Sequence, residues 1–504
     1  MTADSQVHVG RGPVRAGIRD ALRVVAGVLV PLAAEGAVSR RRWVSRLAAW
    51  TDADGRAARV LQRLAARHGT GPLTVRLPGR LLAVVLDPAD VQRLLVGSPS
   101  PFTPASRDKV GALAHFQPTG VLVSAGGDRP ARRRLNVAAL DTDLDVHRLG
   151  EIVRTEMAAL LGSTGPEGLL DWDAFSAAFD RIVRRVVLGG AARDDVVLTD
   201  LLSRLRRDAN WAAFHPRRPA TERAFRDRIE AALRTAEPDC LAGMLAATAR
   251  TQGAGPEVDP AGQLPHWLFA YDAAAIACFR ALAVLATHDD ARGRLTREAA
   301  AAAAAAGKEH PLGSSAPAVL PFARSVVLES LRLWPTTLVI LRESTAPTHW
   351  DGSPATDRAD PAGMLPAGTT FVVVSSFFHR DPTRLDHADR FEPDVWLDGR
   401  AAGSWLLVPF SGGPAGCPGR NLVLLTASTL LATLAERVTL DLVTPTLVDS
   451  ARLRLDPGRP LAGTLDHFRL AFRVSARTST ALISNPSDDL DDARVTSSGR
   501  TAPP

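Results

Sequence analysis

The stretch that decides the fold is PFSGGPAGCPGRNLVLL, residues 409 to 425, in which one cysteine closes a loop rich in glycine and proline. Cys417 stands shortly before an apolar run over residues 422–434 that has the character of a helix. At a helix N-terminus the free backbone amides and the helix dipole lower the pKa of a cysteine, which favours the thiolate form that binds metals. The alternative is a buried, inert thiol after a turn, which is common for a lone cysteine.

The residues around Cys417 favour a metal-binding thiolate. Gly412 and Gly419 remove side chains from the loop, so that a flat cofactor can lie against the backbone. Phe410, seven residues before the cysteine, can shield the sulfur from water. The arrangement of Phe410, Gly412, Cys417 and Gly419 resembles the haem-binding loop of the cytochrome P450 family. This resemblance implies that Cys417 is the axial iron ligand and that the cofactor is haem b, iron protoporphyrin IX.

The resemblance extends roughly from residue 70 to residue 475 and implies the cytochrome P450 fold. That fold is mainly α with small β-sheets, an α+β triangular prism with haem between a long distal helix and the proximal cysteine helix. The chain has 504 residues, beyond the usual single-core limit of about 250 to 300, but no low-complexity linker divides its middle. We therefore expect a flexible N-terminus over residues 1–15, a single haem-binding domain over 16–475 and a disordered tail over 476–504.

Composition narrows the compartment and the partners. Three cysteines are too few for a disulfide framework and fit a reducing cytoplasm. The net charge of +6 arises from basic residues that are nearly all arginine, scattered without the aromatic-interleaved stripe typical of nucleic-acid binding. We expect a cytoplasmic monomer that receives electrons from an acidic ferredoxin or a similar donor and does not bind nucleic acid.

One apolar stretch near the N-terminus, residues 21–34, raises the question of a membrane segment. It is too short to span a bilayer, and Arg23 and Pro31 interrupt it. The favoured interpretation is an amphipathic helix packed on the fold, with a peripheral membrane contact as the alternative and no transmembrane segment.

A long helix is predicted over residues 264–288, where the resemblance places the distal helix. The family has here a small residue, glycine, any residue, an acid and threonine, whereas this chain has Phe269 and Ala270 at the first two positions and Asp272 and Ala273 at the last two. Without the threonine hydroxyl, the usual last proton donor to dioxygen is missing. We assign Asp272 and Ala273 to the catalytic site. The alternative for Asp272 is a structural acid paired with an arginine.

Behind this site the sequence predicts a buried ionic scaffold. Glu329 and Arg332 lie three residues apart in a helical stretch, a spacing at which their side chains can pair. They match the family's Glu-x-x-Arg element, and Arg390 stands in a later segment that resembles its meander motif. The resemblance implies a buried glutamate bridged by two arginines. Arg342, thirteen residues after Glu329, stands where the family keeps an arginine for a haem propionate.

A second propionate arginine is expected in a run of three arginines, although such a run is usually a solvated helix face. The family places an aromatic residue or histidine and, four residues later, an arginine. Counting from Gly127, these positions hold Pro130 and Arg134. Two residues before the cysteine, Ala415 replaces the histidine or arginine of the family. The propionates are therefore expected to depend on Arg134 and Arg342.

Two classes of function follow. The first is a haem-thiolate monooxygenase that oxidises a small or medium-sized hydrophobic molecule of secondary metabolism with dioxygen and electrons from the ferredoxin-type donor. The alternative, favoured by Ala273, is a haem-thiolate enzyme of another type: peroxide-driven, coupling or rearranging. Phe116, Phe269 and Leu338 are candidates for the substrate pocket, with ordinary core packing as the alternative for Phe116.

Overall fold

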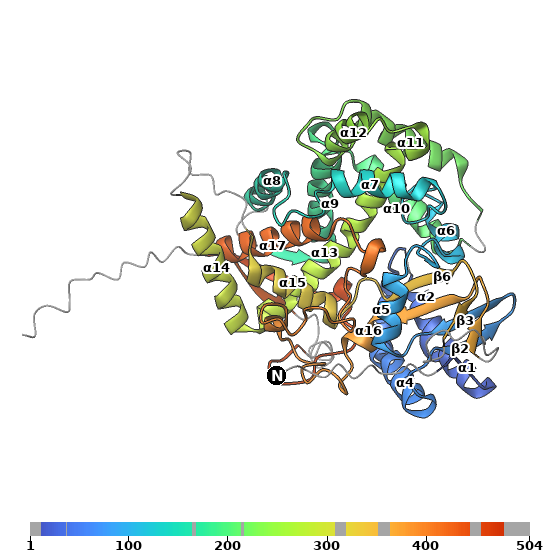
Figure 1. Cartoon of the computed structure of the whole chain (residues 1–504). Coiled ribbons are helices and arrows are strands. Elements are labelled where there is room, and N and C mark those ends of the chain that lie inside the picture. Colours follow the sequence, from blue (N-terminus) through green and yellow to red (C-terminus); the bar gives the residue numbers. More distant parts are fainter. Residues whose placement is uncertain are drawn as a thin grey trace, which may run out of the picture.

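The computed structural model describes residues 12–36, 38–163, 168–212, 216–307, 319–350, 363–443 and 455–477. A large helical body occupies one side of the molecule, and a six-stranded sheet with the N-terminal helices occupies the other (Figure 1). The structure is therefore mainly α with small β-sheets, as the sequence predicts.

The helical body is built around α13 (Leu264–Thr287), which confirms the long helix predicted over residues 264–288. It packs against α9 (Trp172–Leu188), α15 (Pro321–Leu333) and α17 (Arg420–Arg437). Among the described residues, the stretch Pro256–Thr287 is long and apolar enough to cross a membrane, with a window of mean hydropathy 1.8. That window is 78% buried inside the protein, as in the central helix of a large core.

The remaining helices of this body pack around that centre. They are α7 (Asp128–Ala139), α8 (Gly150–Ser163), α10 (Val196–Ala209), α11 (Pro219–Arg234), α12 (Leu241–Thr251) and α14 (Asp289–Gly307). Glu298 of α14 accepts hydrogen bonds from the N–H groups of Phe322 and Ala323, at 2.7 and 2.8 Å. A carboxylate here satisfies two free donors of the first turn of α15 and so fixes where this helix begins.

The N-terminal segment up to residue 68 is helical. It contains α1 (Ile18–Val24), a π-helical turn (Val25–Leu29), α2 (Val30–Glu35), α3 (Arg42–Thr51) and α4 (Ala53–His68). Val24 and Val28 are fully buried, whereas Leu22 and Val30 are 62% and 55% exposed. The stretch over residues 21–34 is therefore amphipathic and packs one face on the fold.

The six-stranded sheet carries the second hydrophobic core. Its order is β1 (Val14–Arg15), β2 (Leu73–Leu77), β3 (Arg80–Val84), β9 (Thr370–Val374), β6 (Val339–Ser344) and β4 (Phe102–Thr103). β2 and β3 form a hairpin, with Leu77 opposite Arg80. β9 pairs parallel to β3 and antiparallel to β6, and every residue of β9 is buried. A strand covered on both faces is apolar throughout, as its sequence TFVVV is.

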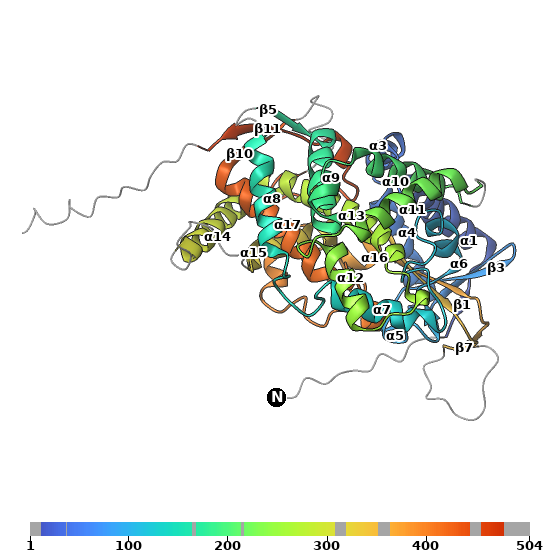
Figure 2. The same cartoon turned by 90° about the horizontal axis from the view of Figure 1, so that it is seen from above.

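Two smaller sheets complete the fold. One contains β10 (Val438–Val443), β11 (Ala471–Ala476) and β5 (Gly168–Asp171), and Figure 2 shows it at the edge of the helical body beside α8 and α9. The other pairs β7 (Thr348–His349) with β8 (Met364–Leu365).

The segment that follows the β2–β3 hairpin contains two helices and a short strand. Residues 97–120 contain β4 and a helix, α6 (Arg107–Leu113). α5 (Pro88–Val96) precedes them and is capped by Asp87, whose carboxylate accepts the N–H of Ala89 at 2.8 Å.

Candidate active site

A cavity of about 1250 Å³ lies between the helical body and the sheet. Its lining includes Asp272 and Ala273 from α13 and Cys417 from the loop before α17. It also includes Arg342 from β6. The cavity therefore brings together residues that the sequence predicts for one site, from segments far apart in the chain.

The loop holds Cys417 by its backbone. The N–H of Cys417 donates to the carbonyl of Phe410 at 3.0 Å. The carbonyls on either side of Cys417 also accept hydrogen bonds. That of Gly416 accepts from the guanidinium of Arg133 at 2.8 Å, and that of Pro418 accepts from the hydroxyl of Thr142 at 2.9 Å. These bonds tie the cysteine loop to α7 and the residues that follow it.

Cys417 differs from the other two cysteines in facing the cavity. Cys240 and Cys278 are buried thiols that do not line it, and burial raises the pKa of Cys278 to about 12. Desolvation by the surrounding protein also raises the pKa of the Cys417 thiol, against the lowering effects of the Gly419 N–H and of Arg133, although this residue is exposed to the cavity. The predicted lowering of the pKa by the helix terminus is therefore outweighed by desolvation. Access to the cavity, rather than a low pKa, distinguishes this cysteine.

The loop glycines serve packing against neighbouring elements. Gly413 has φ 63°, and a Cβ there would lie 2.1 Å from the carbonyl oxygen of Leu95 on α5. A Cβ on Gly412 would lie 2.9 Å from the ring of Trp405. Gly412 and Gly419 do not line the cavity, so their predicted role beside a flat cofactor stays a prediction. Phe410 does line it, as expected.

Basic side chains line the cavity near the cysteine loop. Arg342 is 2% exposed and donates to the hydroxyls of Ser98 and Ser411 at 2.7 and 3.1 Å. Arg129 is 7% exposed and donates to the carbonyl of Val121 at 2.6 Å. Burial, reinforced by the charge of Arg129, lowers the pKa of Arg342 to about 10.

None of these cations has a carboxylate partner among the described residues, although buried charges are normally paired. Arg129, Arg133 and Arg342 all line the cavity. Two haem propionates would supply the missing negative charge, so the residues present fit an iron porphyrin.

Arg134 does not line the cavity, and its side chain is exposed. Arg129 and Arg133, four residues apart on one face of α7, line it instead. The count from Gly127 therefore selects Arg134, one residue after Arg133, which lies on the face of α7 that lines the cavity. Counting from Gly126 gives Arg129 and Arg133, which do line the cavity.

The α13 wall of the cavity runs unbroken through the predicted distal motif. Asp272 forms an ion pair with Arg206 of α10, a partner of the kind that the alternative for this acid expects. Asp180 of α9 also lines the cavity, where burial and the Asp272 carboxylate raise the pKa of Asp180 to about 7. Sequence reasoning missed Arg206 and Asp180, because neither belongs to a local motif.

Two of the three predicted pocket residues line the cavity. Phe269 and Leu338 line the cavity. Phe116 does not, and its ring instead meets the ring of Phe269 edge to face, with centroids 5.4 Å apart. Phe116 therefore supports the wall from behind, which is the packing alternative.

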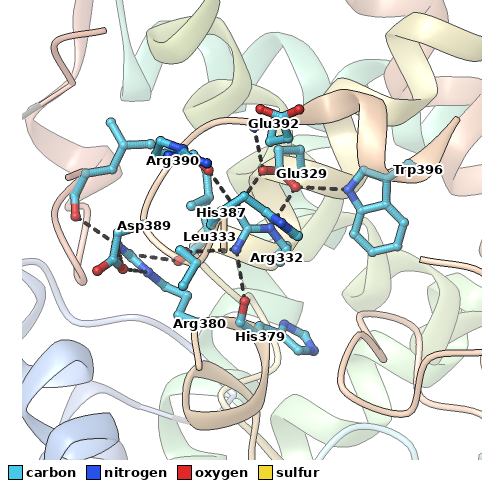
Figure 3. Close-up of polar contacts among 12 residues, drawn as sticks. Glu329, Arg332, Leu333, His379, Arg380, His387, Asp389, Arg390, Glu392 and Trp396 are labelled. Atoms are coloured by element: carbon cyan, nitrogen blue, oxygen red, sulfur yellow. Dashed lines mark hydrogen bonds and ion pairs between the residues drawn. The ribbon is translucent and has the colours of Figure 1, made fainter. Parts of the chain in front are cut away.

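Glu329 and Arg332 form the predicted buried pair, and both side chains are fully buried (Figure 3). Arg332 donates to the two carboxylate oxygens of Glu329 at 2.8 and 2.7 Å, a bidentate geometry. Its remaining N–H groups donate to backbone carbonyls between residues 379 and 390, including those of His379 and Ala388 at 3.0 and 2.9 Å. The pair thus holds α15 to this segment.

Arg390 does not bridge Glu329, contrary to the prediction. Its side chain is exposed, and only its carbonyl takes part, accepting from Arg332 at 2.7 Å. The further donors to Glu329 are the N–H of Glu392 at 2.8 Å and the indole N–H of Trp396 at 3.0 Å (Figure 3). Since four donors already satisfy the carboxylate, a second guanidinium is not needed.

One histidine connects this scaffold to the cysteine loop. The carbonyl of His379, at the end of α16 (Ser375–His379), accepts from Arg332, and its Nε2 accepts the N–H of Val408 at 3.1 Å. Burial, together with the charge of Arg332, lowers the pKa of His379 to about 3. The imidazole is therefore neutral, as an acceptor must be.

Comparison with known proteins points to one family. The family model described as Cytochrome P450 matches residues 268–449, which include Asp272, Glu329, Arg342 and Cys417. Cyclooctat-9-en-7-ol 5-monooxygenase from Streptomyces melanosporofaciens is 32% identical over 120 residues, 23% of this chain and 24% of that protein. Cytochrome P450 4g1 from Drosophila melanogaster is 32% identical over 119 residues, 23% of this chain and 20% of that protein. Cytochrome P450 monooxygenase milC from Cordyceps militaris is 30% identical over 158 residues, 31% and 30% of the two chains.

These alignments therefore span between a fifth and a third of the relatives' own length. A mainly α fold whose central helix and cysteine loop line one cavity fits the class of haem-thiolate proteins. The family model and these relatives support a protein of the cytochrome P450 family.

Proposed function

We propose that this chain is a haem-thiolate monooxygenase that oxidises a small or medium-sized hydrophobic molecule. The observation that carries the proposal is that Cys417 lines the same cavity as Asp272 and Ala273, beside buried arginines that have no carboxylate partner among the described residues. Bound in this cavity, haem b supplies the oxidation of an unreactive carbon by dioxygen.

The side chains of the cavity divide the work of holding the cofactor. Cys417 would bind the iron, and Phe410 would shield the sulfur from water. Arg129, Arg133 and Arg342 would hold the propionates by charge-assisted hydrogen bonds. Since Ala415 has no charge, Arg133, which donates to the carbonyl of the next residue, Gly416, is our candidate to supply a positive charge at that position of the loop.

The chain's own residues also organise the distal side. Phe269, Ala273 and Leu338 give the cavity apolar walls, which favour an apolar substrate and exclude water. Asp180 and Asp272 place two carboxyl groups on the cavity wall, and the raised pKa of Asp180 lets that group take up and release a proton near neutral pH. These acids are our candidates for the proton supply that the missing threonine would provide.

The relatives support the choice of substrate class. The Streptomyces melanosporofaciens proteins that match this chain are named cyclooctat-9-en-7-ol 5-monooxygenase and cyclooctatin synthase. We propose a hydrophobic substrate of secondary metabolism for this chain as well.

The partner and the compartment are part of the same proposal. Arg420, the first residue of α17, and Arg134 of α7 are both exposed near the cysteine loop, where an acidic ferredoxin could dock. We propose a cytoplasmic monomer, whose exposed Ile18, Leu22 and Trp43 allow a peripheral membrane contact.

A haem-thiolate enzyme of another type is the second candidate. α13 is unbroken at Ala273, so that this helix neither opens there nor carries a hydroxyl at that position. A peroxide-driven, coupling or rearranging reaction would need neither. Product formed with hydrogen peroxide alone, at the rate obtained with dioxygen and an electron donor, would favour this candidate.

The test of the proposed function is the absorbance spectrum of the reduced, carbon-monoxide-bound protein. We expect a thiolate-type spectrum in the parent, Cys240→Ser and Cys278→Ser proteins and its loss in Cys417→Ser, because a serine hydroxyl is a poor iron ligand at neutral pH. Retention of the spectrum in Cys417→Ser, with loss in either control, would show that another cysteine binds the iron. Substrate oxidation by the parent enzyme must in addition require dioxygen.

A further inference from the structure

Lys109 is an unusual residue for this cavity. The chain has 60 lysines and arginines, and only two of them are lysines. One of the two, Lys109 of α6, lines the cavity, where its ammonium donates to the carbonyl of Leu341 at 3.1 Å. Leu341 precedes Arg342 on β6, so that this lysine lies on the same side of the cavity as the buried arginine.

No carboxylate among the described residues pairs with Lys109. The adjacent Asp108 is instead paired with Arg80 at 2.8 Å, and Glu343 is taken by Arg107 at 3.8 Å. Burial, with the charges of Arg342 and Arg129, lowers the pKa of Lys109 to about 7. An anion placed here would relieve this repulsion and keep the ammonium charged.

The charges do not balance even with haem bound. Four basic side chains line this part of the cavity, namely Lys109, Arg129, Arg133 and Arg342. Two propionates would neutralise two of these charges, while the thiolate of Cys417 would be neutralised by the ferric porphyrin itself. Two positive charges remain on half-buried side chains that have no carboxylate partner among the described residues, and partly buried charges favour a counter-ion.

A second polar group faces the same space without a partner. His266, in the first turn of α13, lines the cavity, and its buried Nδ1 has no hydrogen-bond partner in the part of the chain that the structure describes. Burial, and then the charge of Lys109, lowers the pKa of His266 to about 4, so its imidazole is neutral. A neutral imidazole can donate one hydrogen bond to an anion that Lys109 attracts.

The neighbouring lining is apolar. Leu113, Phe269 and Leu338 line the same cavity as Lys109 and His266. A ligand that fits these surfaces has an apolar body and one acidic group. We propose that the substrate is a carboxylic acid whose carboxylate is bound by Lys109, with His266 as a second hydrogen-bond donor.

This inference rests on the proposed function and adds the chemical class of the substrate to it. A haem propionate is another carboxylate that Lys109 can bind. The burial of Arg129 and Arg342 favours the substrate as the partner of Lys109. These two arginines are more deeply buried than the half-buried Lys109 and are sufficient for two propionates.

The test is calorimetric titration of the purified haem-loaded protein with two matched pairs of probes. One pair is flexible, dodecanoate and dodecanol, and the other is rigid, adamantane-1-carboxylate and 1-adamantanol. We expect the acid of at least one pair to bind more tightly than its alcohol. In Lys109→Met, which keeps the apolar stem, we expect affinity for that acid to fall about 10- to 100-fold with little change for the alcohol.

Two further variants control for charge. Arg76→Met removes one positive charge from an exposed position on β2 and should leave the preference unchanged. Lys109→Arg should retain most of it. Equal binding of acid and alcohol in both pairs, no acid binding at all, or a preference that survives Lys109→Met would each overturn the inference.

Haem content is measured in parallel, because loss of haem from Lys109→Met alone would show that Lys109 binds a propionate and would also overturn the inference. The titration does not depend on oxygen chemistry. A thiolate-type carbon monoxide spectrum without acid preference would therefore refute only this inference. Acid preference without that spectrum would refute only the monooxygenase.

Discussion

The guanidinium of Arg206 on α10 is ion-paired with the carboxylate of Asp272 on α13. Arg206 is fixed in turn, because it donates to the carbonyl of Val38 at 3.1 Å and its guanidinium lies 5.2 Å from the ring centroid of Phe269. The acid beside Ala273 is therefore held from a neighbouring helix. Its position does not depend on a hydroxyl in α13.

This geometry predicts that Ala273→Thr will not improve the coupling of electron supply to product. In an unbroken helix a threonine hydroxyl bonds back to the carbonyl four residues earlier, here that of Phe269, and is not free to donate into the cavity. Its methyl group would also crowd the wall. We expect hydrogen peroxide released per reductant oxidised to stay equal or rise, measured with a ferredoxin and its reductase as electron supply.

Ala270→Thr, which also adds a hydroxyl on the cavity wall of α13, is the matched control for crowding. A clear fall in peroxide release for Ala273→Thr but not for Ala270→Thr would contradict the prediction. It would show that a hydroxyl at residue 273 is presented to the cavity in spite of the helix.

Local spacing predicts the parts of the site that rigid elements hold. Glu329 and Arg332 share one helix face, and Cys417 stands three residues before the first residue of α17, so sequence distance translates directly into geometry. The buried face of α7 could also have been found. Leu135 and Ala139, both fully buried, mark it, and Arg134 beside Leu135 cannot project in the same direction.

Contacts between distant segments could not be predicted in this way. Two donors to Glu329 come from Glu392 and Trp396, which are 63 and 67 residues away. The family resemblance suggested Arg390 for this role, because an arginine is the obvious partner of a glutamate in a sequence. A backbone N–H group and an indole N–H group cannot be recognised from the sequence as donors to a particular glutamate.

We therefore expect Trp396→Phe to lower the free energy of unfolding more than Trp334→Phe does. It removes a hydrogen bond to a fully buried carboxylate, and hydrogen bonds to charged groups contribute about 1.5 to 3 kcal/mol. Trp334→Phe removes an indole bond of 2.9 Å to the neutral carbonyl of Ala462, for which about 0.5 to 1.5 kcal/mol is expected. Urea unfolding of the two variants and the parent measures the difference, and equal losses would argue against a charged Glu329.

We expect the buried, neutral imidazole of His379 to make the folded protein less stable as the pH falls. Its pKa is about 3 in the folded protein and near 6.5 when unfolded, so that the unfolded chain binds the extra proton as the pH falls below 6.5. The stability contributed by neutral His379 is full above pH 6.5 and decreases by about 1.4 kcal/mol per pH unit towards pH 3.

His379→Gln keeps an acceptor for the N–H of Val408 but does not titrate. Between pH 6.5 and 5 we expect the variant to lose about 2 kcal/mol less of its unfolding free energy than the parent. Asp54 and Asp90, whose pKa values burial raises to about 7, act in the opposite direction in both proteins and cancel in the comparison. Parallel stability curves for the two proteins would mean that His379 is not held neutral.

The last prediction concerns electron delivery. Arg134 and Arg420 are exposed, and they stand beside Arg133 and Cys417, whose neighbourhood the bond from Arg133 to the carbonyl of Gly416 fixes. If an acidic ferredoxin docks on this face, reversing both charges will slow association, and the effect will weaken at high salt because exposed charges are screened. We expect Arg134→Glu with Arg420→Glu to lower the second-order rate of haem reduction about tenfold or more at low salt. The carbon monoxide spectrum should not change. Arg76→Glu on β2 is the control for net charge, and an equal effect of this variant would place the docking surface elsewhere.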